Sequence, residues 1–242
     1  MSYLVALCDG HGLKPTPTPG KRTPRIPQLG GRVIYENEFN RAVVALLDKE
    51  LERCSFRTLL VAPTDADTPL SERTRKANSA GAHLYVSCHY NAGGGEGLET
   101  FHYPRSTKSQ KAAQIIHRHL MASGVKRKDR SVKTANFHVL RETRMPAVLI
   151  EYGFMDDPGL DEAAQMIDPK VQKAFAVATA KGICEYFGVR YVPETQPQPK
   201  PMYRIFADGK FVVDTAYVSK ITQAVEDAVN KQVKKIEMFQ RD

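Results

Sequence analysis

The chain has 242 residues, 42% hydrophobic and 26% charged, which is ordinary for a soluble globular protein and enough for one sizeable core plus a small appendage. Its longest apolar runs fall far short of the roughly 18 residues that a membrane span needs, so we expect no membrane span. The first residues lack a basic segment and soon meet Asp9, which argues against a signal peptide. We therefore expect a protein that is made in the cytoplasm and acts elsewhere only after release by another route.

The net charge of +8 is concentrated in one stretch. Between positions 105 and 144 there are eleven Lys or Arg residues against two acids, Asp129 and Glu142, a surplus of nine. A basic patch of this kind attracts anionic partners. Nucleic acid and another anionic polymer both fit this charge, and a role in solubility alone is a third interpretation.

The first part of the chain predicts a strand, a turn, a loop and a helix. Residues 3–8 form a short apolar run that ends in the turn Asp9-Gly10-His11-Gly12. Five prolines between positions 14 and 28 indicate a surface loop. From position 35 onward apolar residues recur at helical spacing, which places Glu36 in the first turn of a helix.

The rest of the first 190 or so positions alternates strands with helices. The predicted elements, in order, are a strand over 56–62, a helix from 68, a strand over 83–88, a strand over 98–103 that could lie at an edge, a helix over 106–122, a basic loop over 126–134, short strands over 137–141 and 147–150, and a helix over 168–187. This alternation predicts an α/β fold: a mainly parallel twisted sheet with helices on both faces, in one domain over 1–192.

A proline-rich segment over 193–201 predicts an extended linker. Beyond it, 202–242 predict two strands joined at Asp208-Gly209, then a helix and a third strand, which makes a small α+β C-terminal module. A unit this small has a marginal core. A dimer through the C-terminal module, or its packing on the main domain, would supply the missing contacts.

Three residues whose side chains can bind a metal lie at the ends of predicted strands or at the start of a predicted helix. His11 follows the first strand, His89 ends the strand over 83–88, and Glu36 opens a helix. A catalytic zinc site uses three nitrogen or carboxylate ligands plus a water, and α/β sheets build sites at strand ends. We therefore hypothesise that these three residues bind Zn²⁺. Glu151 lies at the end of a predicted buried strand, where a carboxylate has no structural use. We expect Glu151 to take the proton from the metal-bound water and pass it to the leaving amine.

Spacing alone leaves other interpretations open. A histidine between two glycines is more often a surface residue than a ligand, and an acid at a helix start usually serves the helix dipole. The expected substrate contacts are Asn91, His138 and Arg141. We single out His138 because its predicted strand neighbours the one that ends in Glu151.

Several segments together resemble the zinc-dependent N-acetylmuramoyl-L-alanine amidases of the amidase-3 family. The matching segments are Asp9-Gly10-His11-Gly12, Glu36-x-x-x-Asn40, Leu70-x-x-Arg73-x-x-x-Ala77-Asn78, Ser87-Cys88-His89-Tyr90-Asn91 and Pro146-Ala147-Val148-Leu149-Ile150-Glu151-Tyr152-Gly153-Phe154. They occur in the family's order and cover residues 3 to about 188. The chain departs from the family pattern at Asp9, Asn37 and Cys88, but not at any expected ligand.

The resemblance implies zinc on His11, Glu36 and His89, with Glu151 catalytic. It also implies cleavage of the amide between the lactyl group of N-acetylmuramic acid and the L-alanine of the stem peptide. The expected partners are bacterial peptidoglycan and anionic wall polymers. We expect no nucleic acid, because nothing in the chain resembles the acid cluster of a nuclease.

An amidase without an export signal is similar to a phage endolysin, which is made in the host cytoplasm and reaches the wall after release. The C-terminal module over 202–242 resembles the small wall-binding modules found behind such enzymes. A sporulation mother-cell lytic amidase and a zinc peptidase acting within the stem peptide remain alternatives. A wall-binding protein with a dead site is disfavoured, because all four expected site residues are present.

Overall fold

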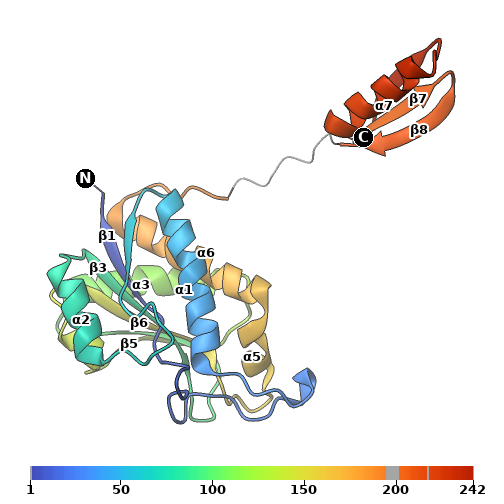
Figure 1. The fold of residues 1–242 in the computed structure, drawn as a ribbon. Coiled ribbons are helices and arrows are strands. Elements are labelled where there is room, and N and C mark those ends of the chain that lie inside the picture. The colour runs from blue at the N-terminus through green and yellow to red at the C-terminus, as the bar shows by residue number, and fades with distance from the viewer. Residues whose placement is uncertain (1, 195–201, 217, 242) are drawn as a thin grey trace. The chain divides into compact units, whose positions relative to one another are not determined.

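The computed structural model describes residues 2–194, 202–216 and 218–241. The chain divides into two compact units, Met1–Glu194 and Thr195–Asp242, which are described separately (Figure 1). The first unit ends two residues beyond the predicted boundary at 192. Most of the predicted linker over 193–201 lies outside the described residues.

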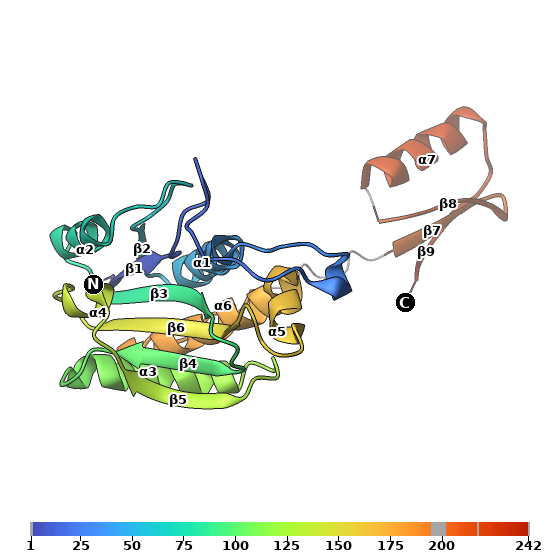
Figure 2. The same ribbon diagram turned by 90° about the horizontal axis from the view of Figure 1, so that it is seen from below.

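A twisted six-stranded sheet forms the centre of the first unit (Figure 2). The strands are β1 (Leu4–Cys8), β2 (Arg57–Leu60), β3 (Leu84–Asn91), β4 (Leu98–His102), β5 (Asp129–Thr134) and β6 (Ala147–Phe154). Their spatial order is β2-β1-β3-β6-β4-β5, and every neighbouring pair is parallel except β4 with β6. The prediction of a mainly parallel sheet is confirmed.

Helices cover both faces of this sheet, as predicted. They are α1 (Glu36–Arg53), α2 (Leu70–Ser79), α3 (Thr107–Met121), α4 (His138–Arg141), α5 (Asp161–Ala164) and α6 (Pro169–Phe187), with short 3₁₀ turns at Pro27–Leu29 and Gln165–Ile167. α1, α3 and α6 pack on the face that carries Val86 and Ile150. α2 and α4 pack on the opposite face, around Tyr85 and Leu149. None of the described helices has both the length and the hydropathy of a membrane span.

The packing of α1 fixes where its first residue lies. Its apolar stripe, which includes Phe39, Val43 and Leu47, is fully buried, and each such side chain contributes about 1.5–3 kcal/mol. The Phe39 ring meets Tyr90 of β3 edge-on at 4.6 Å between centroids. This contact lies one helical turn from Glu36, so the carboxylate at the helix start is held at the end of the sheet.

Three predicted elements differ from the observed ones. The segment over 126–134, predicted as a basic loop, contains β5, which forms the edge of the sheet. β4 therefore lies inside the sheet rather than at its edge. Edge strands commonly carry charged residues, so composition alone made β5 resemble a loop. The segment over 137–141, predicted as a strand, contains the single helical turn α4, since a short apolar run such as Val139-Leu140 fits either structure.

The C-terminal module is α+β, as predicted. Its antiparallel sheet has the order β8-β7-β9, from β7 (Met202–Ala207), β8 (Lys210–Thr215) and β9 (Ile236–Arg241), and α7 (Val218–Asn230) connects β8 to β9. Asp208 and Gly209 join the first two strands with φ of 47° and 75°, as a two-residue hairpin requires. Among the described residues of this unit, the buried apolar ones are Ile205, Ala224 and Ala228, a small core.

Candidate active site

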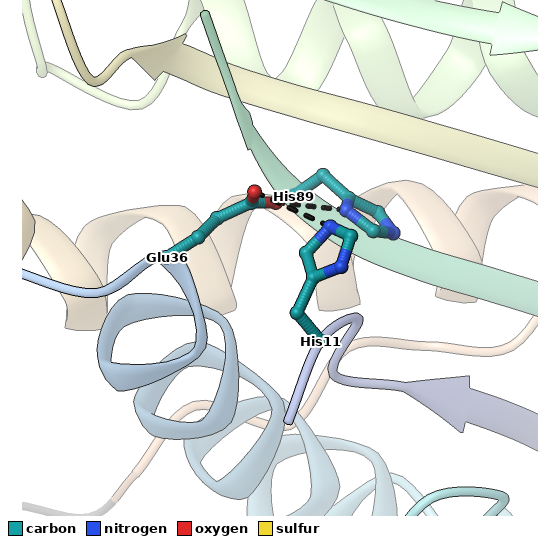
Figure 3. A group of neighbouring side chains, drawn as sticks. All are labelled: His11, Glu36 and His89. Carbon is teal, nitrogen blue, oxygen red and sulfur yellow. Dashed lines mark hydrogen bonds and ion pairs between the residues drawn. The ribbon is translucent and has the colours of Figure 1, made fainter. Parts of the chain in front are cut away.

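Two imidazoles and one carboxylate converge where β1, β3 and α1 meet. His11 lies in the turn after β1, Glu36 is the first residue of α1, and His89 lies in β3 (Figure 3). One ligand atom from each lies within 4.8 Å of the others. His11 Nε2 is 3.3 Å from Glu36 Oε2, and His89 Nδ1 is 2.9 Å from Glu36 Oε1. The structure therefore brings together the three segments that were expected to form the metal site.

The chemistry of this group suits a zinc ion. Within the described part of the chain, His11 Nε2 and Glu36 Oε2 are buried without a hydrogen-bond partner. Leaving two such atoms unpaired is costly, and a cation between them would satisfy both. Two imidazole nitrogens and a carboxylate oxygen form a donor set common in catalytic zinc sites, which leave the fourth position to water or substrate. The residues present fit the metal.

Neighbouring groups orient the carboxylate and one of the imidazoles. His89 Nε2 lies 3.0 Å from Ser87 Oγ, which leaves Nδ1 turned toward Glu36. Asn40 Nδ2 and the backbone N–H of Tyr90 both donate to Glu36 Oε1, each at 3.2 Å. Such outer hydrogen bonds fix ligand geometry and usually change metal affinity by about 10–100-fold when removed.

The turn that carries His11 is anchored to α1. Asn37 Nδ2 donates to the backbone oxygen of Asp9 at 2.8 Å, and Arg41 Nε donates to its carboxylate at 3.0 Å. Two of the departures from the family pattern, Asp9 and Asn37, therefore contact each other. Gly10, which links Asp9 to His11, has φ of +71°. A Cβ at this position would lie 2.7 Å from Asn40 Nδ2 and 2.9 Å from the His89 ring. Only glycine fits this position without moving a ligand.

The protonation states at neutral pH are those that bind a cation. Burial pushes the pKa of Glu36 upward, but the hydrogen bond from His89, the two imidazoles and the nearby Lys21 outweigh it and lower the pKa from 4.5 to about 2. Burial lowers the pKa of His11 from 6.5 to about 4, and the Glu36 carboxylate opposes this only in part. An ionised carboxylate and a neutral imidazole need no proton loss to bind a metal.

Glu151 lies beside this group but is not part of it. β3 and β6 pair His89 with Glu151, and paired residues of neighbouring strands project from the same face. Both residues lie inside their strands rather than at the ends, because β3 and β6 extend to Asn91 and Phe154. In the region that the structure describes, Glu151 Oε2 is buried without a hydrogen-bond partner.

The surroundings of Glu151 favour its protonated form. Burial raises its pKa well above the ordinary 4.5, the carboxylates of Glu36 and Glu99 raise it further, and Lys21 opposes them. A raised pKa makes the carboxylate a stronger base than an ordinary glutamate, and the carboxylic acid formed when it accepts a proton can still donate that proton. This is the property expected of a group that relays a proton between water and a leaving amine.

The comparison with known proteins agrees with this geometry. Residues 5–185 match the model of the N-acetylmuramoyl-L-alanine amidase family. The chain belongs to this family. The sporulation-specific N-acetylmuramoyl-L-alanine amidase of Bacillus subtilis (strain 168) is 35% identical over 149 residues, 62% of this chain and 57% of that protein. The endolysin of Bacillus phage SPP1 is 37% identical over 199 residues, 78% of this chain and 68% of that protein.

A solved amidase shares the fold of the first unit. The catalytic domain of CwlV, an N-acetylmuramoyl-L-alanine amidase from Bacillus (Paenibacillus) polymyxa var. colistinus, superposes with a TM-score of 0.68 at 30% identity. The match covers 78% of this chain and 99% of that domain. The chain spans only between half and three fifths of the length of two curated amidases that it matches.

The structure does not bring two expected substrate contacts to the amidase site. His138 and Arg141 lie in α4, which precedes β6, and Asn78 of α2 donates to the backbone oxygen of Glu142 at 2.8 Å. α4 therefore lies at the amino ends of β3 and β6, whereas the metal group lies toward their carboxyl ends. The strand on which the expectation for His138 depended is a helix.

Asn91, the third expected contact, lies in β3 two residues after His89. It contacts Glu99, a residue that sequence reasoning missed. Its side-chain amide donates to Glu99 Oε1 at 2.7 Å, and Glu99 faces Glu151 across the β4–β6 pair. Arg130 Nε donates to Glu99 Oε2 at 2.8 Å, and Lys133 also binds this oxygen. Glu99 is only 3% exposed. This cluster joins residues from β3, β4 and β5, so no local pattern in the sequence marks it.

The basic stretch over 105–144 is partly neutralised inside the fold. The Arg127 side chain is 2% exposed and donates to the Tyr152 carbonyl and the Tyr90 hydroxyl. Arg130 and Lys133 bind Glu99, as described above, and Arg118 pairs with Glu185. Several of the eleven cations therefore serve the fold, and the surface carries less of this charge than the composition suggests.

Proposed function

We propose that the chain is a zinc-dependent hydrolase that cleaves the amide between N-acetylmuramic acid and L-alanine in peptidoglycan. One observation carries the proposal. In an amidase-family fold, ligand atoms on His11 and Glu36 are buried and have no hydrogen-bond partner among the described residues, and the same holds for a carboxyl oxygen of Glu151, which pairs with His89 across β3 and β6. A structural role explains none of these atoms, and metal-assisted amide hydrolysis uses all of them.

The residues have distinct roles in the proposed reaction. His11, Glu36 and His89 would hold the zinc ion, which when bound polarises the scissile carbonyl and acidifies water. Glu151 accepts the proton of the attacking water. As the carbon–nitrogen bond breaks, Glu151 donates that proton to the amine of L-alanine, so the same carboxyl group is base and then acid.

Product analysis distinguishes an amidase from a zinc peptidase that acts within the stem peptide. We expect digestion of purified peptidoglycan to release peptides with a free L-alanine amino terminus and glycans with an unsubstituted lactyl carboxylate. Amino-terminal labelling and mass spectrometry measure both products. New amino termini on any other stem residue, with L-alanine still attached to muramic acid, would replace the amidase proposal with the peptidase.

For the biological role we propose a phage endolysin that acts on the wall after release from the host cytoplasm. The similarity to the SPP1 endolysin, which extends over 78% of the chain, supports this role. The similarity to a sporulation-specific amidase supports the alternative of a mother-cell lytic enzyme. Expression together with a holin separates the two, because an endolysin lyses growing cells once the membrane is permeable.

We also propose that the C-terminal module binds the wall. The boundary for testing it is Glu194, because the last residues before it pack on the first unit. Tyr191 Oη donates to Glu50 Oε2 at 2.6 Å, Arg53 Nε donates to the Val192 carbonyl at 2.9 Å, and Lys173 pairs with Glu194 at 2.8 Å. A chain that ends at 192 would lose the last of these contacts.

A chain that ends at Glu194 should hydrolyse solubilised wall fragments nearly as fast as the full chain. Its binding to whole walls should weaken by about tenfold or more, because a second binding module adds to affinity through effective concentration. Co-sedimentation with purified walls measures binding, and release of L-alanine amino termini measures turnover. Equal sedimentation of the two chains would show that the module does not target the wall.

A further inference from the structure

Lys21 lies in the proline-rich segment predicted as a surface loop, but its backbone is fixed. The backbone N–H of Glu36 donates to the Lys21 carbonyl at 2.9 Å. Two positions on, Thr23 N donates to the Ile34 carbonyl at 2.8 Å and Thr23 Oγ1 accepts from Ile34 N at 2.9 Å. Thr23 is 2% exposed. These bonds align residues 21–23 with residues 34–36, so Lys21 is held next to the start of α1.

The side chain of Lys21 reaches the active site. Its Nζ lies 3.7 Å from Glu36 Oε2, the same oxygen that faces His11. The charge of Lys21 also lowers the pKa of both His11 and Glu151. The ammonium therefore lies beside the metal-binding group, and its charge also acts on Glu151.

A purely structural ion pair does not account for this placement. The Nζ–Oε2 separation is too long for a hydrogen bond, and Lys21 is 41% exposed, so the pair contributes little to stability. Arg130 and Lys133, on the other side of Glu151, already bind Glu99. Lys21 thus combines a fixed backbone, access from solvent and, among the residues that the structure describes, an ammonium without a hydrogen-bond acceptor beside the metal-binding group.

We propose that Lys21 is a further catalytic residue, whose ammonium donates a hydrogen bond to the scissile carbonyl oxygen and stabilises the negative charge that develops there. This inference rests on the proposed amidase function. When water adds to the carbonyl carbon, a carbon–oxygen bond forms, the π electrons move to the carbonyl oxygen and the water proton passes to Glu151. When the intermediate collapses, the carbonyl reforms and the nitrogen leaves with the proton from Glu151. Lys21 keeps its own proton throughout.

The proposal predicts a defect in kcat. Removing one donor to a developing oxyanion typically lowers kcat by about 10²–10³-fold, so we expect a loss of this size for Lys21→Met with KM nearly unchanged. Lys21→Arg keeps a cationic donor and should recover part of the loss. Arg22→Met is the matched control, because its side chain is exposed and projects from the other side of the same extended segment. It should behave as the wild type does.

Zinc affinity, measured by chelator competition, separates catalysis from support of the metal site. Lys21→Met should bind zinc as tightly as the wild type or more tightly, since it lacks a positive charge near the ligands. An unchanged kcat, a loss that follows lost zinc, or a defect confined to KM would each overturn the proposal. Failure of the proposed function would appear in the wild type instead, as cleavage of a different bond, and the same Lys21 comparison would then be made on that bond.

Discussion

Glu151→Gln should lose about 10³-fold or more of its turnover while it binds one zinc ion per chain, as the wild type should. Glutamine has nearly the shape of glutamate but can neither accept nor return the proton of water. Glu151 lies outside the group whose ligand atoms converge, so its replacement leaves the metal site intact. Release of L-alanine amino termini measures turnover, and elemental analysis of dialysed protein measures zinc.

The matched control for this variant is Glu185→Gln. Glu185 is an exposed residue of α6 that pairs with Arg118, away from the site. This control should keep full activity. Loss of zinc in Glu151→Gln would contradict the assignment, because it would place Glu151 among the ligands.

The same variant also has an expected effect on stability. In the zinc-free protein, burial raises the pKa of Glu151 above 4.5, so ionisation at neutral pH opposes folding. The stability that the carboxyl group contributes is fully present below pH 4.5 and is lost as pH rises through the raised pKa. Zinc-free Glu151→Gln should therefore melt at or above the wild type at neutral pH, and the difference should shrink toward pH 4.5. Thermal unfolding at several pH values measures this.

The sequence was informative where one residue type conflicts with its surroundings. A glutamate in the buried run before Phe154 is unusual enough to mark a site from the chain alone, whereas a histidine between two glycines indicates a ligand only together with the other motifs. Helical spacing from Phe39 onward then predicted the helix that places Glu36 at the sheet. These signals are local, and with His89 at the end of the predicted strand over 83–88 they located all three residues of the group that the structure brings together.

What the sequence missed depends on partners far apart in the chain. Glu99 is significant because β4 places it opposite Glu151 and because β5 brings Arg130 to it. Lys21 lies among prolines and threonines, and only its pairing with the start of α1 places it near Glu36. His138 shows the opposite error, in which a short apolar run fits a strand or a helix and tertiary packing decides.

His89→Ala and His11→Ala should each lose both zinc and activity. Each variant removes one of three ligands, so the loss of zinc affinity should exceed the roughly 10–100-fold that follows loss of an outer hydrogen bond. His119→Ala is the matched control, because this partly exposed histidine of α3 pairs with Glu185 and lies outside the convergent group. It should keep zinc and activity.

Thermal unfolding tests the ligand assignment without relying on activity. A ligand that binds only the folded state stabilises it by about 4 kcal/mol when its free concentration is a thousand times the dissociation constant. Zinc should therefore raise the melting temperature of the wild type and of Glu151→Gln, but not that of His89→Ala. His89→Ala also removes the hydrogen bonds of His89 to Glu36 and Ser87, so the comparison is the change in melting temperature that zinc produces in each protein. An active His89→Ala that retains stoichiometric zinc would show that the metal binds elsewhere.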